Sequence, residues 1–326
     1  MRRRYASTLL AVGACSALAA GAWAQVTIDP VVTSIGALRD PVPGRDPLYV
    51  FRGESNVQFP VINAAHDVVF RARSASQFDT NAGNAWGIYV KRDGDPLAVL
   101  ADTTVDDAGT PGFPVPGRSA TAYFTDFKAP LLNDTGDVLF HGTFYDPDTG
   151  SGSGLYATTV TGGAIVKIAD TSDTVPGFSV PFLGFSSAAA DQDLTQAVVN
   201  DAGQIAFWAS FSGSPNGGLF GSTVAGGAIV QLADRSTTPT GVPFGTPQPF
   251  TDIRPNFAMN ANGLVAFHGT IRLNSSTGPQ RNGNYVVPVT GGTLPANVAF
   301  QFQVAPDAGG ATFSGISDED IDASGR

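Results

Sequence analysis

Asn133-Asp-Thr-Gly-Asp-Val-Leu-Phe-His-Gly-Thr-Phe144 is the stretch around which the rest of the chain is organised. Similar stretches are Asn200-Asp-Ala-Gly-Gln-Ile-Ala-Phe-Trp-Ala-Ser-Phe211, Asn260-Ala-Asn-Gly-Leu-Val-Ala-Phe-His-Gly-Thr-Ile271 and, more weakly, Asn63-Ala-Ala-His-Asp-Val-Val-Phe-Arg-Ala-Arg73. Their starts lie about 60 to 70 residues apart, a period typical of repeat architectures. The last residues, 322–326, resemble the opening of a fifth copy.

Each copy spells a turn followed by a strand. An asparagine side chain can hydrogen-bond the main chain two residues on, and a glycine three positions later can take the left-handed conformation that closes the turn. The first copy carries His66 where the others have glycine, which predicts a strained turn or another turn type. The β-branched and aromatic run that follows, alternating with small residues, predicts a strand.

A complete unit is clearest between residues 124 and 170. The pattern predicts four strands, over residues 124–132, 137–144, 154–160 and 164–170. A polar loop is expected over residues 146–153, and the Gly162-Gly163 pair suits a two-residue hairpin loop between the third and fourth strands. No segment after the first two dozen residues has a convincing helical period.

Four short antiparallel strands in each repeated unit indicate an all-β fold. We expect a β-propeller-like array of four-stranded antiparallel blades of about 60 to 70 residues each. The alternatives are a β-solenoid, whose rungs are usually shorter, and a string of sandwich domains. Residues 25–326 then form a single domain, with repeats near 45–113, 114–177, 178–244 and 245–305 and a partial repeat at 306–326.

The two ends of the chain bear on how such an array would close. Residues 31–44 resemble residues 165–177, so the chain is expected to begin with the last strand of a repeat. A split fifth blade would take that strand from the N-terminus and its first strand from the segment at Phe313. Because the sequence stops where the next second strand should begin, we expect the intact protein to be longer at its C-terminus.

The first 24 residues are predicted to be a signal peptide. Arg2, Arg3 and Arg4 precede an apolar run, and Ala22-Trp-Ala24 is a cleavage site of the A-x-A kind. No later apolar stretch approaches the roughly 20 residues that a membrane span needs. The mature chain is therefore expected to be exported, to the periplasm, the cell surface or the medium.

Cys15 is the only cysteine of the chain, and it lies within this leader. The residues before it loosely resemble a bacterial lipobox, which leaves lipidation at Cys15 as an alternative to ordinary cleavage. With ordinary cleavage the mature chain has no cysteine, which excludes disulfides, thiolate chemistry and cysteine-based zinc sites.

Charge and composition limit the partners. Hydrophobic residues make up 42% of the chain, but charged residues only 14%, against about 25% in typical globular domains. Without the leader, 15 basic residues face 28 acidic ones. A net negative chain argues against binding nucleic acid or an anionic membrane surface, because both favour a basic face.

The repeated Asn-x-x-Gly-x-Val-Ala-Phe unit, the Gly-Leu-Tyr strand and the Ile-Ala-Asp ending together resemble a family of exported bacterial tandem-repeat proteins of unknown function. The resemblance covers nearly all of the mature chain. It implies a β-propeller-like fold and, in many members, a C-terminal sorting or anchoring segment. It brings no assigned catalytic residues, so none is carried over to this chain.

Four candidate ligand-binding residues directly follow the repeated phenylalanine: Arg71, His141, Trp208 and His268. Equivalent positions in a closed array would form a ring. His141 and His268 lie two repeats apart in it and could face each other. The ring residues could then contact a ligand, or the two histidines could bind a metal. Metal sites need three or four ligands, and no third equivalent histidine exists, so we predict no metal and no cofactor. The competing interpretation is that these side chains fill space between blades.

Acidic residues recur as well. Asp126 and Asp252 occupy equivalent places in the first strand, and two carboxylates are the minimum for glycoside hydrolysis. Repetition alone also explains their identity. Three further aspartates end the fourth strands, where they are expected to cap the exit turns rather than to bind calcium: Asp102, Asp170 and Asp234.

These patterns favour an exported, non-enzymatic repeat scaffold with a binding or structural role at the cell surface or outside the cell. What recurs is packing and turn chemistry, while loop lengths vary. The alternative is a carbohydrate-binding or carbohydrate-active, glycosidase-like propeller that uses the ring residues with Asp126 and Asp252. The expected partner is an extracellular glycan or a cell-surface component.

Overall fold

The computed structural model describes residues 41–43, 49–51, 57–76, 85–103, 113–185, 196–213, 217–304 and 312–314. Every helix or strand element in these ranges is a β-strand, and no helix there is long and apolar enough to cross a membrane. The predicted leader with Cys15, residues 31–40 and residues 315–326 lie outside the described ranges.

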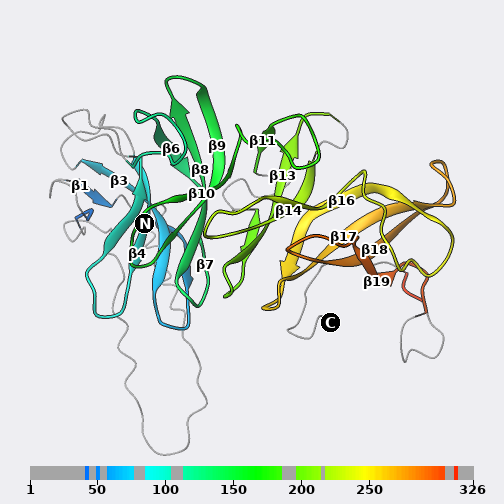
Figure 1. Cartoon of the computed structure of the whole chain (residues 1–326). Coiled ribbons are helices and arrows are strands. Elements are labelled where there is room, and N and C mark those ends of the chain that lie inside the picture. The colour runs from blue at the N-terminus through cyan, green and yellow to red at the C-terminus, as the bar shows by residue number, and fades with distance from the viewer. Residues whose placement is uncertain are drawn as a thin grey trace, which may run out of the picture.

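The strands form four antiparallel sheets that stand in one row, and none of these sheets closes into a barrel within the described ranges (Figure 1). The first sheet holds β1 (Tyr49–Phe51), β2 (Val57–Ile62), β3 (Val68–Ser76), β4 (Ala85–Lys91) and β5 (Ala98–Asp102). The second holds β6 (Tyr123–Phe127), β7 (Leu131–Leu132), β8 (Asp137–Asp146), β9 (Gly150–Thr159) and β10 (Val166–Asp170). The third holds β11 (Phe182–Gly184), β12 (Ala197–Val199), β13 (Gln204–Phe211), β14 (Gly217–Thr223) and β15 (Val230–Asp234). The fourth holds β16 (Pro247–Met259), β17 (Leu264–Leu273), β18 (Gln280–Pro288) and β19 (Ala296–Phe300).

All four sheets share one order of four strand positions, in which each position pairs with the next one along the chain. Position one is β1 with β2, β6 with β7, β11 with β12, or β16 alone; position two is β3, β8, β13 or β17. Positions three and four follow in the same way, ending at β5, β10, β15 and β19. The all-β class and the antiparallel sheets predicted from the sequence are therefore confirmed, but three of the sheets have five strands rather than four.

Position one differs from the prediction, because three of the four sheets divide it into two short strands. In the second sheet the predicted single strand over residues 124–132 becomes β6 and β7. Between them the main-chain N–H of Lys128 donates to the carbonyl of His141, at 2.9 Å, and Pro130 has no N–H to give to β8. The strand therefore breaks where a proline interrupts its hydrogen bonding.

The connections within the second sheet also differ from the prediction. Residues 146–153 were expected to be a polar loop, but β8 and β9 continue into them and pair up to Asp146 opposite Gly150. The Asp146 side chain holds this tip, because it accepts hydrogen bonds from Asp148 N–H and from the hydroxyls of Thr149 and Ser119. The Gly162-Gly163 connection spans residues 160–165 and is longer than a two-residue hairpin loop.

The asparagine turns between positions one and two form where the sequence predicts them, and the predicted bond to the N–H two residues on is present at Asn200 and Asn260, at 3.1 and 3.0 Å. The side-chain oxygen of the asparagine accepts the N–H four residues on at 2.7–3.0 Å in all four turns, which start at Asn63, Asn133, Asn200 and Asn260. The fourth residue of each turn is left-handed: Gly136, Gly203 and Gly263 have φ of 87°, 70° and 75°, and His66 has 65°. His66 therefore adopts the same turn in a conformation that favours glycine.

Successive turns are also hydrogen-bonded to one another. Ala64 N–H donates to Asp134 Oδ1 and Asp134 N–H donates to Asp201 Oδ1, both at 2.8 Å. The side-chain amides of Asn133 and Asn200 donate to the carbonyls of Asn200 and Asn260, at 2.8 and 3.3 Å. These bonds fix neighbouring sheets side by side along one edge of the row.

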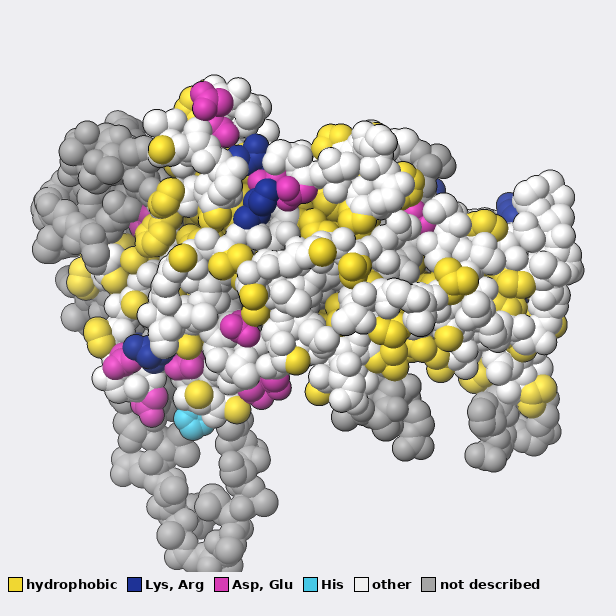
Figure 2. Space-filling view, in the orientation of Figure 1, with side chains coloured by type: hydrophobic (Ala, Val, Ile, Leu, Met, Phe, Trp, Pro, Cys, Tyr) yellow, Lys and Arg dark blue, Asp and Glu magenta, His cyan; other side chains and the backbone are white. Residues whose placement is uncertain are grey.

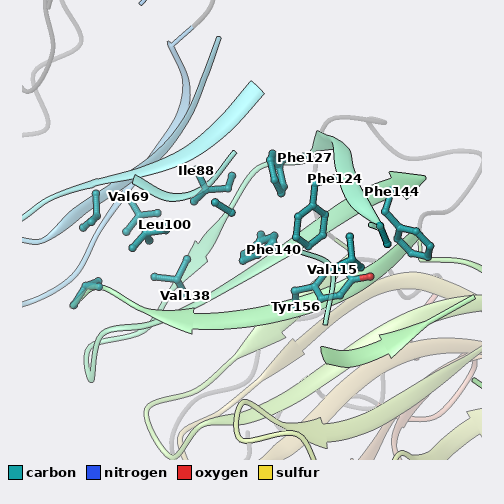
Figure 3. Packing of buried hydrophobic residues seen from close by; sticks show 14 residues of the cluster. Val69, Ile88, Leu100, Val115, Phe124, Phe127, Val138, Phe140, Phe144 and Tyr156 are labelled. Atoms are coloured by element: carbon teal, nitrogen blue, oxygen red, sulfur yellow. The ribbon is translucent and has the colours of Figure 1, made fainter. Parts of the chain in front are cut away.

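A cluster of three aromatic rings recurs in the core of every sheet. One ring meets the central ring edge-on, with centroids 4.8–5.2 Å apart and planes at 85–90°, and another stacks on it at 27–28°. The central rings are Tyr89, Tyr156, Phe220 and Tyr285. In the second sheet the cluster packs against Val69, Ile88 and Leu100 of the first (Figure 3). Branched side chains of one sheet thus cover the aromatic rings of the next.

Candidate functional site

The four candidates of the predicted ring occupy one structural place. Each lies in the strand at position two, opposite a residue of position three: Arg71 with Ile88, His141 with Leu155, Trp208 with Leu219 and His268 with Asn284. Arg71, His141 and His268 are buried, and Trp208 is half-buried. Their equivalence, expected from the sequence, therefore holds in the structure.

Arg71 joins the first sheet to the second. One of its terminal nitrogens lies 2.9 Å from Asp126 Oδ1, the other donates to Gln58 Oε1 at 2.9 Å, and its guanidinium lies 3.7 Å from the centre of a Trp86 ring. A cation over an indole face is a favourable stacking arrangement. Arg71 and Asp126 are thus used together to link two sheets.

His141 lies at the junction between the second and third sheets. Its ring centre is 6.3 Å from that of Phe185. Neither ring nitrogen has a hydrogen-bond partner among the described residues. Burial, reinforced by the nearby Lys128 ammonium, lowers the pKa of His141 to about 4. The imidazole is therefore neutral at physiological pH and lies in an apolar setting.

Trp208 and Asp252 belong to the junction between the third and fourth sheets. Trp208 packs against the apolar cluster that includes Phe250 and Ile253. Asp252 accepts a hydrogen bond from Arg235 at 3.2 Å, and both side chains of this ion pair are largely exposed, at 54% and 43%. Asp252 is thus paired with an arginine, as Asp126 is, but on the surface.

Of the six candidates, Arg71 and Asp126 are in direct contact. His141 and His268 lie in the second and fourth sheets, with the third between them (Figure 1). Within the described ranges no group of three His, Cys, Asp or Glu side chains is arranged to hold a metal ion.

Two of the three aspartates that end position four, Asp170 and Asp234, cap their exit turns as predicted. The segment at 104–112, after Asp102, lies outside the described residues. Asp170 Oδ1 accepts from Ser172 N–H at 2.8 Å and from its hydroxyl at 2.6 Å. Asp234 Oδ1 does the same with Ser236, also at 2.8 and 2.6 Å. The two exit turns are therefore closed by the same contacts.

A group of charged side chains that sequence reasoning missed surrounds Asp170. Arg118 Nε and Nη2 contact its two carboxylate oxygens at 3.0 and 2.9 Å, and the Arg118 and Asp170 side chains are 7% and 0% exposed. Lys167 Nζ lies 3.7 Å from Asp170 Oδ2 and 2.7 Å from Asp173 Oδ1. Burial, together with the Asp170 charge, raises the pKa of the nearby Tyr156 phenol. Four formal charges therefore converge at one end of β10.

Alignment of the repeats contains a signal for this group. Lys167, Asp173 and Arg118 are charged where the third sheet has Gln231, Thr237 and Phe178. A search for charges that depart from the repeated pattern would have found them. The prediction from the sequence followed polar residues that recur, and these three charges do not recur.

A family model matches residues 5–326, which is nearly the whole chain. The chain belongs to the family of unknown function DUF7453. No curated protein matches this DUF7453 chain.

Solved structures similar to this DUF7453 chain have low identity to it. The endo-arabinase from Bacteroides thetaiotaomicron VPI-5482 is 9% identical with a TM-score of 0.30, and the match covers 74% of this chain and 80% of that one. A protein of unknown function from Dyadobacter fermentans DSM 18053 is 14% identical with a TM-score of 0.32, over 84% and 73%. The mannose phosphorylase MPT-4 from Leishmania mexicana, in complex with phosphate ion, is 10% identical with a TM-score of 0.27, over 79% and 70%.

Proposed function

We propose that this protein is an exported, non-enzymatic β-sheet scaffold with a binding or structural role at the cell surface or outside the cell. The observation that carries the proposal is that Arg71 and Asp126, which could have served a site, instead pair with each other across the junction of two sheets. A buried charge is tolerated when it is paired and hydrogen-bonded. Here the pair serves packing between sheets.

The placement of the two candidate carboxylates supports a non-enzymatic role. Glycoside hydrolysis needs two carboxyl groups about 5 to 10 Å apart, on either side of one bond. Asp126 and Asp252 belong to the second and fourth sheets, with the third between them, and each is paired with an arginine. Each carboxylate is thus engaged by an arginine, which supports a structural role for both.

We infer further that the sheets are blades of a propeller-like array. The strands of each unit pair within their own antiparallel sheet, whereas the rungs of a solenoid pair between successive units. The one parallel contact among the described residues is the isolated bridge from Thr240 to Ala296. The shared strand order, turn and ring cluster support the blade interpretation and disfavour the solenoid.

The edge of the fourth sheet supports a further blade beyond it. In each sheet the register between positions three and four shifts at one residue of position four. This residue is buried in the first three sheets, where Leu100, Ile168 and Leu232 are 2%, 4% and 3% exposed. In the fourth sheet it is Val298, which is 50% exposed. The bridge from Val304 to Thr312 matches the bridges that precede β6 and β11. Phe313 thus stands where Phe124 and Phe182 start their sheets.

Assays on polysaccharides test the non-enzymatic role. The mature chain is incubated with a panel of plant, fungal and bacterial polysaccharides, and released reducing ends are measured. We expect no release above a boiled control. Release that is abolished by both Asp126→Asn and Asp252→Asn would overturn the proposal in favour of a glycosidase. Sequencing the N-terminus of the protein purified from its native cells tests export, with Gln25 expected first.

Binding of a carbohydrate without hydrolysis is a second candidate, because one observation favours it. The charged group around Lys167 and Asp173 opens into a hollow between two sheets, and packing at the equivalent junction is achieved without these charges. This binding role would be compatible with a non-enzymatic scaffold.

A further inference from the structure

A cavity of about 400 Å³ lies between the outer strand of the second sheet and the β14–β15 hairpin of the third. Its walls include Lys167, Ile168, Asp173, Pro176, Gly226 and Ile229. Ligand sites are typically concave, roughly 300 to 1,000 Å³ in volume, and mostly apolar with a few placed polar groups. This cavity therefore has the size and the mixed lining of a site for one small molecule.

The polar part of the lining is a charge pair that remains open to solvent. Lys167 Nζ lies 2.7 Å from Asp173 Oδ1, and the two side chains are 25% and 28% exposed. The main-chain N–H of Asp170 donates to the other Asp173 oxygen at 2.8 Å, which holds the carboxylate in place. The pair therefore offers a fixed acceptor beside an ammonium donor, at the surface of the cavity.

Packing does not account for this pair. The junction between the third and fourth sheets has the same turns and the same ring cluster, with Gln231 in place of Lys167 and Thr237 in place of Asp173. In that junction the Thr237 hydroxyl accepts the equivalent Asp234 N–H, at 3.1 Å. The charges are thus an addition to a frame that folds without them, in a chain with only 14% charged residues.

Figure 2 shows that lysine, arginine and acidic side chains are few over the face that it presents. Beside the cavity four charged side chains converge: Arg118 and Asp170, which are buried, and Lys167 and Asp173, which are partly exposed. Two are basic and two acidic, so their formal charges cancel. The site is therefore suited to a neutral polar molecule rather than to an ion.

We propose that this cavity binds one residue of a neutral saccharide, through adjacent hydroxyl groups shared between Asp173 and Lys167. The carboxylate accepts from one hydroxyl and the ammonium donates to its neighbour, and hydrogen bonds to charged groups are the stronger kind. Pro176 and Ile229 supply an apolar wall for the C–H face of the ring. This inference rests on the proposed binding role and names its ligand class.

Saturation-transfer NMR with neutral methyl glycosides of glucose, galactose, mannose and arabinose tests the proposal on the mature chain. We expect saturation transfer to at least one glycoside, and titration should give an affinity about tenfold weaker with Asp173→Asn or Lys167→Gln. The matched control is Gln231→Leu at the equivalent place in the third sheet, which should leave the affinity unchanged. Thr174→Trp, which places a bulky side chain among the residues that line the cavity and keeps both charges, should also abolish the transfer.

Three results would overturn the inference: no transfer to any of these glycosides, the same affinity in Asp173→Asn and Thr174→Trp as in the wild type, or preferential binding of inorganic phosphate. The Thr174→Trp chain serves as the test if the charge variants do not fold. Failure here leaves the scaffold proposal standing, because that proposal is tested separately by polysaccharide hydrolysis and by the N-terminal sequence.

Discussion

The side-chain amide of Asn133 donates a hydrogen bond of 2.8 Å to the main-chain carbonyl of Asn200, which lies 67 residues later in the next sheet. The same side chain donates to Asp137 Oδ2 at 2.9 Å, and its oxygen accepts from Asp137 N–H at 2.7 Å. One asparagine therefore closes its own turn and ties that turn to its neighbour.

Replacing Asn133 with alanine should destabilise the fold by about 2 kcal/mol, because buried partners lose hydrogen bonds. The midpoint of urea unfolding measures the loss. Asn256→Ala is the matched control, because Asn256 is exposed and should cost less than about 0.5 kcal/mol. Equal effects of the two substitutions would show that the link between turns contributes nothing.

The contribution of an arginine–aspartate pair to the free energy of unfolding should depend on how deeply the pair is buried. Arg118→Met removes the two close arginine contacts of the buried Asp170, leaving Lys167 at 3.7 Å, and should cost about 3 kcal/mol. Arg235→Met breaks the exposed pair with Asp252 and should cost less than about 1 kcal/mol. Thermal or urea unfolding of the two variants gives the comparison, and a larger loss for Arg235→Met would contradict the structure.

His141 should make the fold sensitive to mild acid. Its pKa is about 4 in the folded chain, against the ordinary 6.5 of a histidine in an unfolded chain, so the unfolded chain binds more protons between these two values. Stability is then complete above about pH 6.5 and falls as the pH drops to about 4, by at most about 3 kcal/mol. The groups that face His141 are Lys128 and the uncharged ring of Phe185.

Urea unfolding of the wild type and of His141→Leu, at about pH 7.5 and about pH 4.5, isolates this contribution, because the carboxylates titrate in both chains. The wild type should lose more stability than the variant between the two pH values. An equal loss in both chains would show that His141 is already protonated when buried, or that it does not titrate in this range.

The proposed further blade can be tested by cross-linking in a chain that starts at Gln25 and so has no native cysteine. In the sequence, Ile316 follows Phe313 by three positions, as Phe185 follows Phe182, and the ring of Phe185 lies beside that of His141. If a further blade starts at Phe313, His268→Cys with Ile316→Cys should form a disulfide within one chain on mild oxidation. The control pair, His141→Cys with Phe185→Cys, reports whether this spacing between two sheets can be bridged.

Non-reducing electrophoresis and intact mass measure the product of that oxidation. A disulfide between two chains, or none when the control pair closes, would contradict a blade that starts at Phe313. Disulfides require Cα atoms less than about 7 Å apart, so the test is stringent.

Much of this fold could be predicted from the asparagine turns and the strands beside them. Asn133 and the left-handed Gly136 form their turn with residues close to them in the sequence. Contacts of this kind can be predicted from the sequence alone. The break at Pro130 was missed because it depends on which N–H the neighbouring strand requires. The hairpin tip at Asp146 was missed because its polar residues hydrogen-bond one another and allow pairing to continue.

The candidate site was harder to predict than the fold. The equivalence of Arg71 and His141 was visible, but whether such residues face a ligand or a neighbouring sheet is decided by contacts between units. The pair of Lys167 and Asp173 has no counterpart elsewhere in the repeats, so a search for recurring residues passes over it. Residues that recur in every repeat are those that the fold requires, whereas charged residues that occur in one repeat alone are better candidates for a binding site.

The near-identity of the ring clusters at Tyr89, Tyr156, Phe220 and Tyr285 has a consequence for how such a gene can change. A cut between any two sheets exposes branched side chains on one side and a three-ring cluster on the other. Recombination that deletes or duplicates one whole unit in frame therefore rejoins surfaces that already fit. The number of sheets can then vary among descendants without any new core having to be selected.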